Sequence, residues 1–191
     1  MKKILALVAI ALLASCENAP TGYVAEPITY SKPPIRVNVA SITVVEDYQA
    51  PIRTPNVEHE FMLPPAVAVK EWAAERLKAT GKTGTLEVVI SDASVKETKL
   101  QKTKGLTGLF TDDQDSRYDA SLNVTLRLYD GVNPISVAMG DVIITRMRTI
   151  NEKATIDDRL RLFHAMTKDM MAAFDAQAEQ RLRQYFSAYV R

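Results

Sequence analysis

Apolar and polar residues alternate without a break over residues 118–128, and this pattern leaves the chain few ways to fold. Successive side chains of a β-strand point to opposite faces of a sheet. One face of this strand is therefore buried and the other is wet, which is typical of an antiparallel sheet. The apolar face consists of Tyr118, Ala120, Leu122, Val124, Leu126 and Leu128, and the polar face consists of Asp119, Ser121, Asn123, Thr125 and Arg127.

The stretch from Thr155 to Arg191 contains no Pro or Gly and predicts one long helix. Thr155 or Asp157 can cap its first turn. A helix of about 35 residues extends roughly 50 Å, so we expect its distal end to overhang the sheet. The stripe that we expect to be buried steps through Ile156, Leu160, Phe163, Thr167, Met170 and Phe174, and continues through Ala178, Leu182, Tyr185 and Tyr189.

Three further strands are predicted by shorter alternating runs. The run over 35–46 changes parity near residues 40–41, and the run over 86–95 changes parity near Asp92. Each change of parity indicates a β-bulge. The fourth strand spans 137–150.

A second helix is predicted to begin at Pro64-Pro65, because proline is tolerated in a first turn, and to end near Gly81. Trp72 is expected to anchor this helix in the core. The order of elements is then β-α-β-β-β-α. It predicts an α+β fold with a four-stranded, mainly antiparallel sheet, both helices packed on one face and a long C-terminal helix.

The first 15 residues have the parts of a secretory signal. Lys2 and Lys3 carry positive charge, residues 4–13 are apolar, and small residues precede Cys16. The apolar run is shorter than the about 20 residues that a membrane-spanning helix needs. Residues 1–15 are therefore predicted to be a signal peptide that is removed.

Leu13-Ala14-Ser15-Cys16 resembles the lipobox of bacterial lipoproteins. The resemblance implies that Cys16 receives a diacylglycerol and a further acyl chain such as palmitate, and several chains give stable anchoring. It also implies that the protein faces the periplasm, and Glu17 favours the outer membrane over the inner. Cys16 is the only cysteine, so it has no disulfide partner within the chain. The alternative is an ordinary signal peptide cut near Ser15, with Cys16 unmodified.

Residues 16–34 contain four prolines among small and polar residues and predict a lipidated Cys followed by an extended tether. Residues 35–191 are predicted to form a single α+β domain. Without Lys2 and Lys3, 22 basic residues stand against 23 acidic residues. Such a balance attracts neither nucleic acid nor an anionic membrane surface. We therefore predict no nucleic-acid partner and assign membrane binding to the lipid anchor.

The sequence contains no recognisable catalytic set, so we predict a non-enzymatic protein without a cofactor. A metal site needs three or four converging ligands, and the two histidines, His59 and His164, lie far apart in the sequence. Asp112, Asp113 and Asp115 lack the glycine and distal glutamate of a calcium loop. We predict a plain acidic turn at these residues and no metal site.

One segment, Gly105 to Phe110, combines two glycines with Leu106, Leu109 and Phe110. Loops run over protein surfaces, and exposed apolar groups on them often mark contact sites. These three side chains either insert into a partner protein or a lipid phase, or fold back over the end of the sheet and complete the core.

The mature chain also resembles the auxiliary lipoproteins of ABC-type envelope lipid transport. The matching pieces are Ile35–Val45, Lys70–Leu77 with Trp72 and Ala73, Tyr118–Leu128 and Asp157–Tyr189. The resemblance implies a non-enzymatic subunit that binds an envelope protein partner.

The first hypothesis is therefore an accessory or assembly subunit of an envelope complex, which makes contact through the 105–110 loop or the exposed end of the last helix. The alternative is a carrier that holds a lipid or cell-wall fragment between sheet and helices, in a cavity lined by Leu122, Val124, Met170 and Phe174. The sequence leaves open the identity of the partner and the oligomeric state.

Overall fold

The long alternating segment forms the centre of the sheet. In the computed structural model, which describes residues 22–101 and 114–190, this segment is β6, Gln114–Tyr129. β7, Ala138–Asn151, pairs with one side of β6 in antiparallel register. β4, Thr85–Asp92, and β5, Val95–Lys99, share the other side. β2, Ser41–Glu46, lies on the outer side of β4 and runs parallel to it.

The main sheet of the described residues has five strands, not four, because the predicted strand over 86–95 is divided. Its register against β6 shifts between Ile90 and Asp92. The chain then resumes pairing at Val95, opposite Ala120. The bulge expected near Asp92 is confirmed, and it separates β4 from β5.

The predicted strand over 35–46 is also two strands. β1, Ile35–Val37, pairs in parallel with β3, Leu77–Ala79, and these form a separate small sheet. The parity change near residues 40–41 marks the point where the chain leaves that small sheet and enters β2 in the main one.

The helix after Pro64 is α2, Pro65–Arg76, and it is shorter than predicted. The prediction that Gly81 ends it was wrong, because the chain leaves the helix at Leu77 to pair with β1. Gly81 has another role. A Cβ at this position would lie 2.6 Å from the backbone carbon of Asn38, so only glycine lets the two segments cross.

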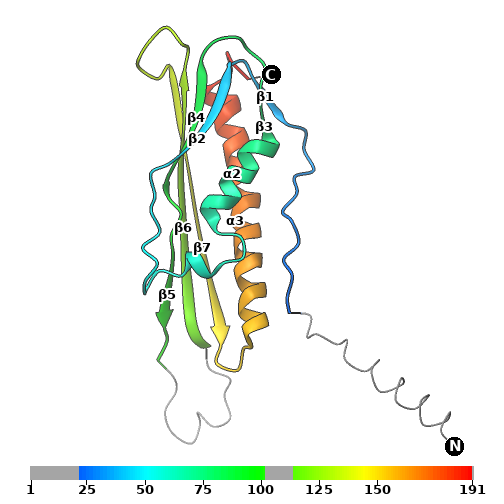
Figure 1. Cartoon of the computed structure of the whole chain (residues 1–191), viewed down its shortest axis with the longest axis vertical. Helices are drawn as coiled ribbons and strands as arrows, with labels where there is room; N and C mark the ends of the chain where they lie inside the picture. Colours follow the sequence, from blue (N-terminus) through cyan, green and yellow to red (C-terminus); the bar gives the residue numbers. More distant parts are fainter. Residues whose placement is uncertain (1–21, 102–113, 191) are drawn as a thin grey trace, which may run out of the picture.

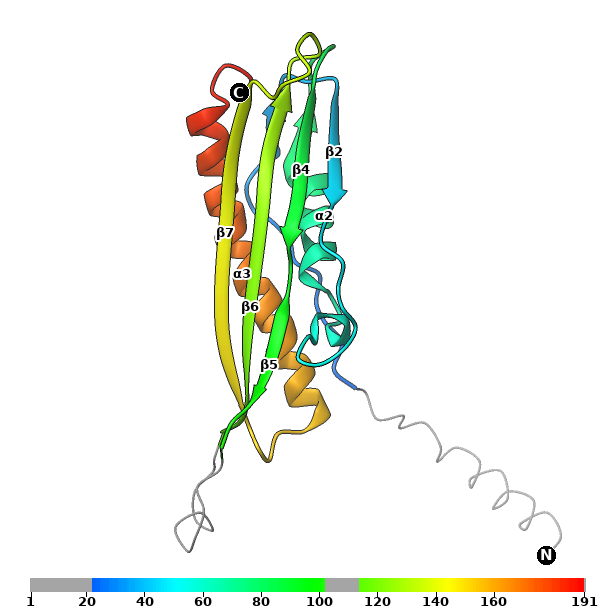
Figure 2. The ribbon, with the colours of Figure 1, turned by 90° about the vertical axis from the view of Figure 1, so that its left-hand side faces the viewer.

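α2 and α3, Ile156–Tyr185, cover one face of the sheet and leave the other face open (Figure 1, Figure 2). Of the two predicted caps, Thr155 is the one that starts α3, and it forms a capping box with Asp158. Trp72 is completely buried and packs edge-on against Phe174, with 4.8 Å between the ring centroids, which confirms its role as core anchor. The α+β class with both helices on one face is therefore confirmed.

α3 does not overhang the sheet. Its 30 residues extend about 45 Å, and the 14 residues of β7 extend about 46 Å. The overhang prediction was wrong because the helix ends at Tyr185, earlier than expected, and β7 is about as long as the helix. Ala178, Leu182 and Phe186 are buried at the far end of the helix, whereas the prediction was wrong for Ile156 and Tyr185 of the same stripe, which are exposed.

Within the described residues, no helix has both the length and the apolarity that a membrane crossing requires.

Candidate functional site

The residues that the sequence singled out as sites lie outside the described part of the chain. They are Cys16, Leu106, Leu109 and Phe110. Their flanks are described. The segment that follows Cys16 is described from Gly22 onward, and the 105–110 segment lies between the end of β5 and the start of β6. Lipidation and partner contact at these residues stay predictions.

Residues 22–34, the described part of the predicted tether, run along α3 (Figure 1). Ile28 and Tyr30 pack against the core. The backbone N–H of Tyr30 donates to Glu75 on α2 at 3.3 Å, and burial raises the pKa of the Tyr30 phenol. This part of the segment therefore has a fixed position against the helices.

A buried charged cluster holds the segment in place. We call it the Arg76 cluster, and its members are Lys32, Trp72, Arg76, Asp175 and Glu179. Arg76 is only 1% exposed. Its guanidinium donates to Asp175 at 2.6 Å, to Glu179 at 3.1 Å, and to the backbone carbonyls of Lys32 and Pro33. One arginine thus joins α2, α3 and the N-terminal segment.

The two carboxylates of the Arg76 cluster are each shared. Asp175 also accepts a hydrogen bond from the indole N–H of Trp72 at 2.9 Å. Glu179 also pairs with Lys32 at 2.9 Å and with Arg183 at 2.9 Å. The hydrogen bonds from Lys32 and Arg183 hold the pKa of Glu179 below its usual range. The cluster is saturated with partners, which is the arrangement that a buried charge requires.

The two histidines take different positions. His59 is exposed in a short 3-10 helix, η1, Glu58–Glu60. Its neighbour Glu58 is buried and accepts hydrogen bonds from Tyr48 at 2.6 Å and from the backbone N–H of Val95 at 3.0 Å. Glu58 thereby fixes this loop to β5. His164 is buried on α3, and no group of potential metal ligands occurs among residues 22–101 and 114–190.

The cavity that the carrier hypothesis expected is filled by side chains. Its four proposed lining residues are completely buried and belong to one continuous core: Leu122, Val124, Met170 and Phe174.

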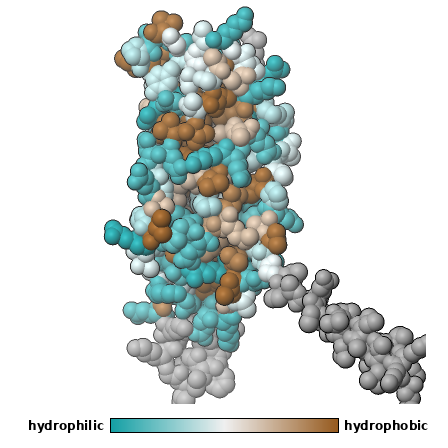
Figure 3. All heavy atoms as spheres, in the orientation of Figure 1, coloured by the Kyte–Doolittle hydropathy of each residue, from teal (hydrophilic) through white to brown (hydrophobic). Residues whose placement is uncertain are grey.

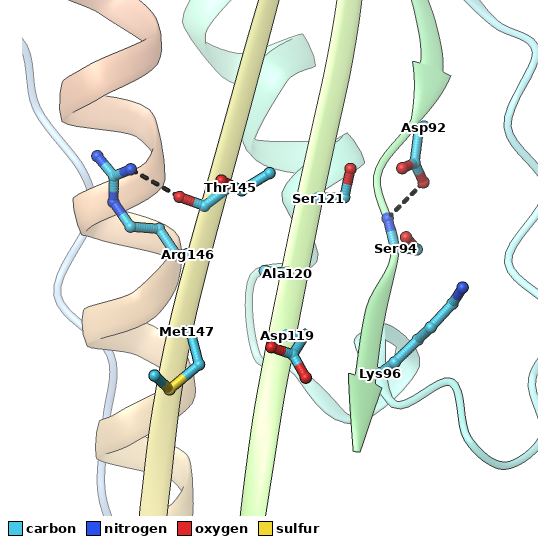
Figure 4. A pocket seen from close by; sticks show the side chains of 9 residues that line it. All are labelled: Asp92, Ser94, Lys96, Asp119, Ala120, Ser121, Thr145, Arg146 and Met147. Atoms are coloured by element: carbon cyan, nitrogen blue, oxygen red, sulfur yellow. Dashed lines mark hydrogen bonds between the residues drawn. The ribbon is translucent and has the colours of Figure 1, made fainter. Parts of the chain in front are cut away.

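The open face of the sheet carries a groove of about 510 Å³ at the β4–β5 bulge (Figure 4). It is lined by Asp92, Ser94, Lys96, Asp119, Ala120, Ser121, Thr145, Arg146 and Met147. The bulge is held by the N–H of Ser94, which donates to Asp92 at 3.0 Å. Asp119 pairs with Arg117 at 2.8 Å. Most of the lining residues are polar and they carry both signs of charge, so the groove offers hydroxyl, carboxylate and cationic groups for hydrogen bonding.

The free edge of β7 is capped by arginines. In the described structure β7 pairs with β6 only, and an edge of 14 residues could accept a foreign strand. Arg181 of α3 donates to the carbonyl of Asp141 at 3.2 Å, and Arg146 and Arg148 donate to the carbonyls of the residues before them. These contacts disfavour addition of a strand at this edge.

The β6–β7 hairpin tip, residues 130–137, is an exposed apolar feature that the sequence reading passed over. Asp130 accepts from the N–H groups of Val132 and Asn133, both at 2.9 Å, and the hydrogen bond from Asn133 is the main cause that lowers its pKa. On this ordered turn Val132 is 86% and Ile135 75% exposed. Figure 3 shows that apolar side chains on this side of the molecule form small separate groups, one of them at this tip.

The signal for the tip was present in the sequence. Two apolar residues stand among turn residues in Asp130 to Ile135, which is the same pattern that drew attention to the 105–110 segment.

A second charged cluster lies at the start of α3. We call it the Glu97 cluster, and it contains Glu97, Lys99, Asp115, Tyr118 and Arg159. Lys99 contacts Glu97 at 3.2 Å and Asp115 at 2.9 Å. Burial, with the Glu97 carboxylate beside it, raises the pKa of Tyr118 to about 12. Burial alone would raise the pKa of Glu97. Hydrogen bonds from Ser116, Lys99 and Tyr118 outweigh this effect, so the pKa of Glu97 lies below its usual value.

The chain is thus an α+β protein whose conspicuous surface features are a docked N-terminal segment, a polar groove and an apolar hairpin tip. No protein-family model matches it, and no curated protein matches its sequence.

Among solved structures, it is similar to the rare lipoprotein B from Shewanella oneidensis, with 9% identity over 75% of this chain and 97% of that chain and a TM-score of 0.35. It is similar to an uncharacterized lipoprotein B from Nitrosomonas europaea, with 11% identity over 77% and 85% and a TM-score of 0.42. A neuraminyllactose-binding hemagglutinin homologue from Helicobacter pylori has 9% identity over 83% and 91% and a TM-score of 0.40. At such scores the likeness assigns neither a family nor a function to this chain.

Proposed function

We propose that this protein is a lipid-anchored envelope lipoprotein that serves as a non-enzymatic accessory subunit of an envelope complex. The observation that carries the proposal is the sequence Leu13-Ala14-Ser15-Cys16 behind a short apolar signal, with Cys16 as the only cysteine. The non-enzymatic part rests on the sequence, which contains no recognisable catalytic set. The outer membrane is the proposed location, since Glu17 follows the cysteine.

The fold gives such a protein two distinct ends. Tyr23 contacts Arg161 in the first turns of α3, so the anchored segment leaves the domain near the start of that helix. The hairpin tip precedes β7 and α3 follows it, so the length of β7, about 46 Å, separates the two ends. In this proposal the start of α3 faces the bilayer, and the hairpin tip presents Val132 and Ile135 to a protein partner.

The anchor is tested by the mass of the N-terminal peptide of the protein purified from its host. We expect Cys16 to carry a diacylglycerol and an acyl chain, and Cys16→Ser to lose both and to move to the soluble periplasmic fraction. An unmodified mature N-terminus at or near Ser15 would overturn the lipoprotein proposal.

The partner contact is tested by crosslinking in intact cells. We expect Val132→Asp with Ile135→Asp to remove a crosslinked complex while leaving the protein folded and membrane-bound. The matched control is Ile156→Asp, because Ile156 is also an exposed apolar residue, 80% exposed, but lies at the other end of the molecule. Equal loss of the complex in both variants would remove the hairpin tip from the proposal.

The 105–110 segment is tested in the same assay. Its flanks lie at the anchored end, so we propose that Leu106, Leu109 and Phe110 contact the lipid phase or the membrane-proximal part of the partner. Leu109→Asp with Phe110→Asp should weaken the crosslinks; unchanged crosslinks in a folded double variant would exclude the segment as a contact.

A further inference from the structure

The N-terminal segment and α3 line an open cavity of about 540 Å³ near the start of the segment. Tyr23, Val24 and Glu26 line it from the segment, and Arg161, His164 and Lys168 line it from α3. Positions 161, 164 and 168 are three and four residues apart, so these three side chains share one face of the helix.

The cations of this cavity are not neutralised by neighbouring acids. Arg161 stacks on the ring of Tyr23 at 4.6 Å. Within the described residues neither Arg161 nor Lys168 makes an ion pair, whereas Lys32 and Lys99 both do. Asp158 feels the charge of Arg161, which contributes to lowering the pKa of that aspartate, but its carboxylate is bound in the capping box of α3. Among residues 22–101 and 114–190, the one acidic side chain that lines the cavity is Glu26.

His164 adds an unsatisfied polar group. The residue is 9% exposed, and its Nδ1 is buried without a hydrogen-bond partner in the described structure. A buried polar atom without a partner is unfavourable, so such an atom often marks a place where a ligand supplies what the protein does not.

The position of the cavity relative to the anchor indicates its ligand. Gly22 is six positions after Cys16, and six extended residues reach at most about 20 Å. A lipid on Cys16 therefore keeps the cavity close to the polar headgroup layer. Arg, Lys and Tyr are suited to that layer, because each joins an apolar body to a polar end.

We propose that this cavity binds the phosphate group of an anionic membrane lipid beside the chain's own lipid anchor, with Arg161 and Lys168 as the phosphate-binding residues. The proximity argument rests on the proposed lipidation of Cys16, but the binding site belongs to the folded domain. Bound lipid would fix how the domain stands on the bilayer, since the anchor alone is a single attachment point.

The test uses the mature chain with Cys16→Ser, so that the anchor does not contribute to binding. The chain is titrated with dihexanoyl phosphatidylglycerol below its micelle concentration, and NMR signals of the His164 and Tyr23 rings are followed. We expect both signals to shift to saturation. Each cation near an anionic lipid is worth about 1 kcal/mol, so Arg161→Gln with Lys168→Gln should weaken binding about 30-fold.

The matched control is Lys78→Gln with Lys82→Gln, which removes the same charge from exposed positions outside the cavity. We expect less than about a threefold change, because these lysines lie outside the range of unscreened interaction. Equal weakening in both double variants overturns the proposal in favour of general charge attraction. Saturation by inorganic phosphate at the same concentrations as the lipid overturns the assignment to a lipid and leaves a small-anion site. An unlipidated Cys16 in the host would defeat the proposed function without changing these titrations.

Discussion

The Arg76 cluster and the Glu97 cluster contain similar residues and differ in where they lie. Arg76 is buried between two helices and the N-terminal segment, and every strong donor in its cluster has an acceptor there. Lys99 is 66% exposed on its side chain, at the solvent-facing end of the sheet. A buried charge that loses its partner has no water to solvate it. An exposed charge that loses its carboxylate partner is solvated by water instead, at little cost in free energy.

This difference in burial indicates which of the two clusters determines how distant segments of the chain are arranged. The Arg76 cluster joins residues 99 and 103 positions apart and fixes the segment that leads to the proposed anchor. The Glu97 cluster mainly joins the neighbouring strands β5 and β6, which the sheet already holds together, and its link to α3 is the longer contact of Arg159 with Glu97 at 3.5 Å. The Arg76 cluster is therefore expected to govern stability and the orientation of the N-terminal segment. The Glu97 cluster is expected to affect mainly the charges at the surface.

The largest effect is expected from Asp175→Ala. The variant leaves the buried Arg76 guanidinium and the Trp72 indole without their shared acceptor, and breaking a buried pair in this way costs about 3–5 kcal/mol. Urea denaturation of the mature Cys16→Ser chain measures the free energy of unfolding. The control is Asp169→Ala, which breaks an ion pair with Arg148 in which both side chains are nearly half exposed; we expect less than about 0.5 kcal/mol there. Similar losses in the two variants would show that burial does not distinguish the clusters.

A smaller effect, about 1.5 kcal/mol at neutral pH, is expected from Glu179→Gln, because the charge-assisted hydrogen bonds from Lys32, Arg76 and Arg183 weaken. The folded pKa of Glu179 lies below its ordinary value of 4.5. Its carboxylate therefore stabilises the fold above pH 4.5, and this contribution is lost as the pH falls through the folded pKa.

The pH dependence distinguishes this explanation from a packing effect. The difference in unfolding free energy between the parent chain and Glu179→Gln should shrink as the pH is lowered from 6 to about 3. A difference that stays constant over that range would mean that the substitution acts through shape and not through charge. Hydrogen exchange of the amides of residues 28–32 should increase in the variant, since Lys32 loses its charged partner.

Local patterns in the sequence predicted the elements well where one face is buried. The alternation over 118–128 gave the strand, its two faces and the antiparallel pairing, because side-chain direction in a strand depends only on residue parity. The start of β6 was missed. Gln114 to Arg117 continue the ladder with polar residues, and backbone pairing there needs no apolar side chain.

Contacts between distant segments could not be predicted from the sequence. Arg76 lies four residues after Trp72, on the face that the helix buries, and a charge at such a position demands a partner. That much could have been predicted. The partner, Asp175, lies on another helix, and no spacing rule links the two. The division of 35–46 into β1 and β2 was missed for the same reason, since it depends on β3 and on the close crossing at Gly81.

The smallest effect is expected from Glu97→Gln, which keeps the shape of the side chain and removes its charge. The side chain of Glu97 is largely covered, but its main cationic partner Lys99 is mostly in water. We expect a loss of about 0.5–1 kcal/mol at neutral pH and low salt. Because exposed charges are screened, most of that loss should disappear in 1 M salt, where the Debye length is about 3 Å. The loss from Asp175→Ala should persist in the same salt, since water and ions do not reach Arg76. If instead the Glu97 variant were as salt-insensitive and as costly as the Asp175 variant, both clusters would be structural, and the contrast between buried and exposed charge would not hold in this fold.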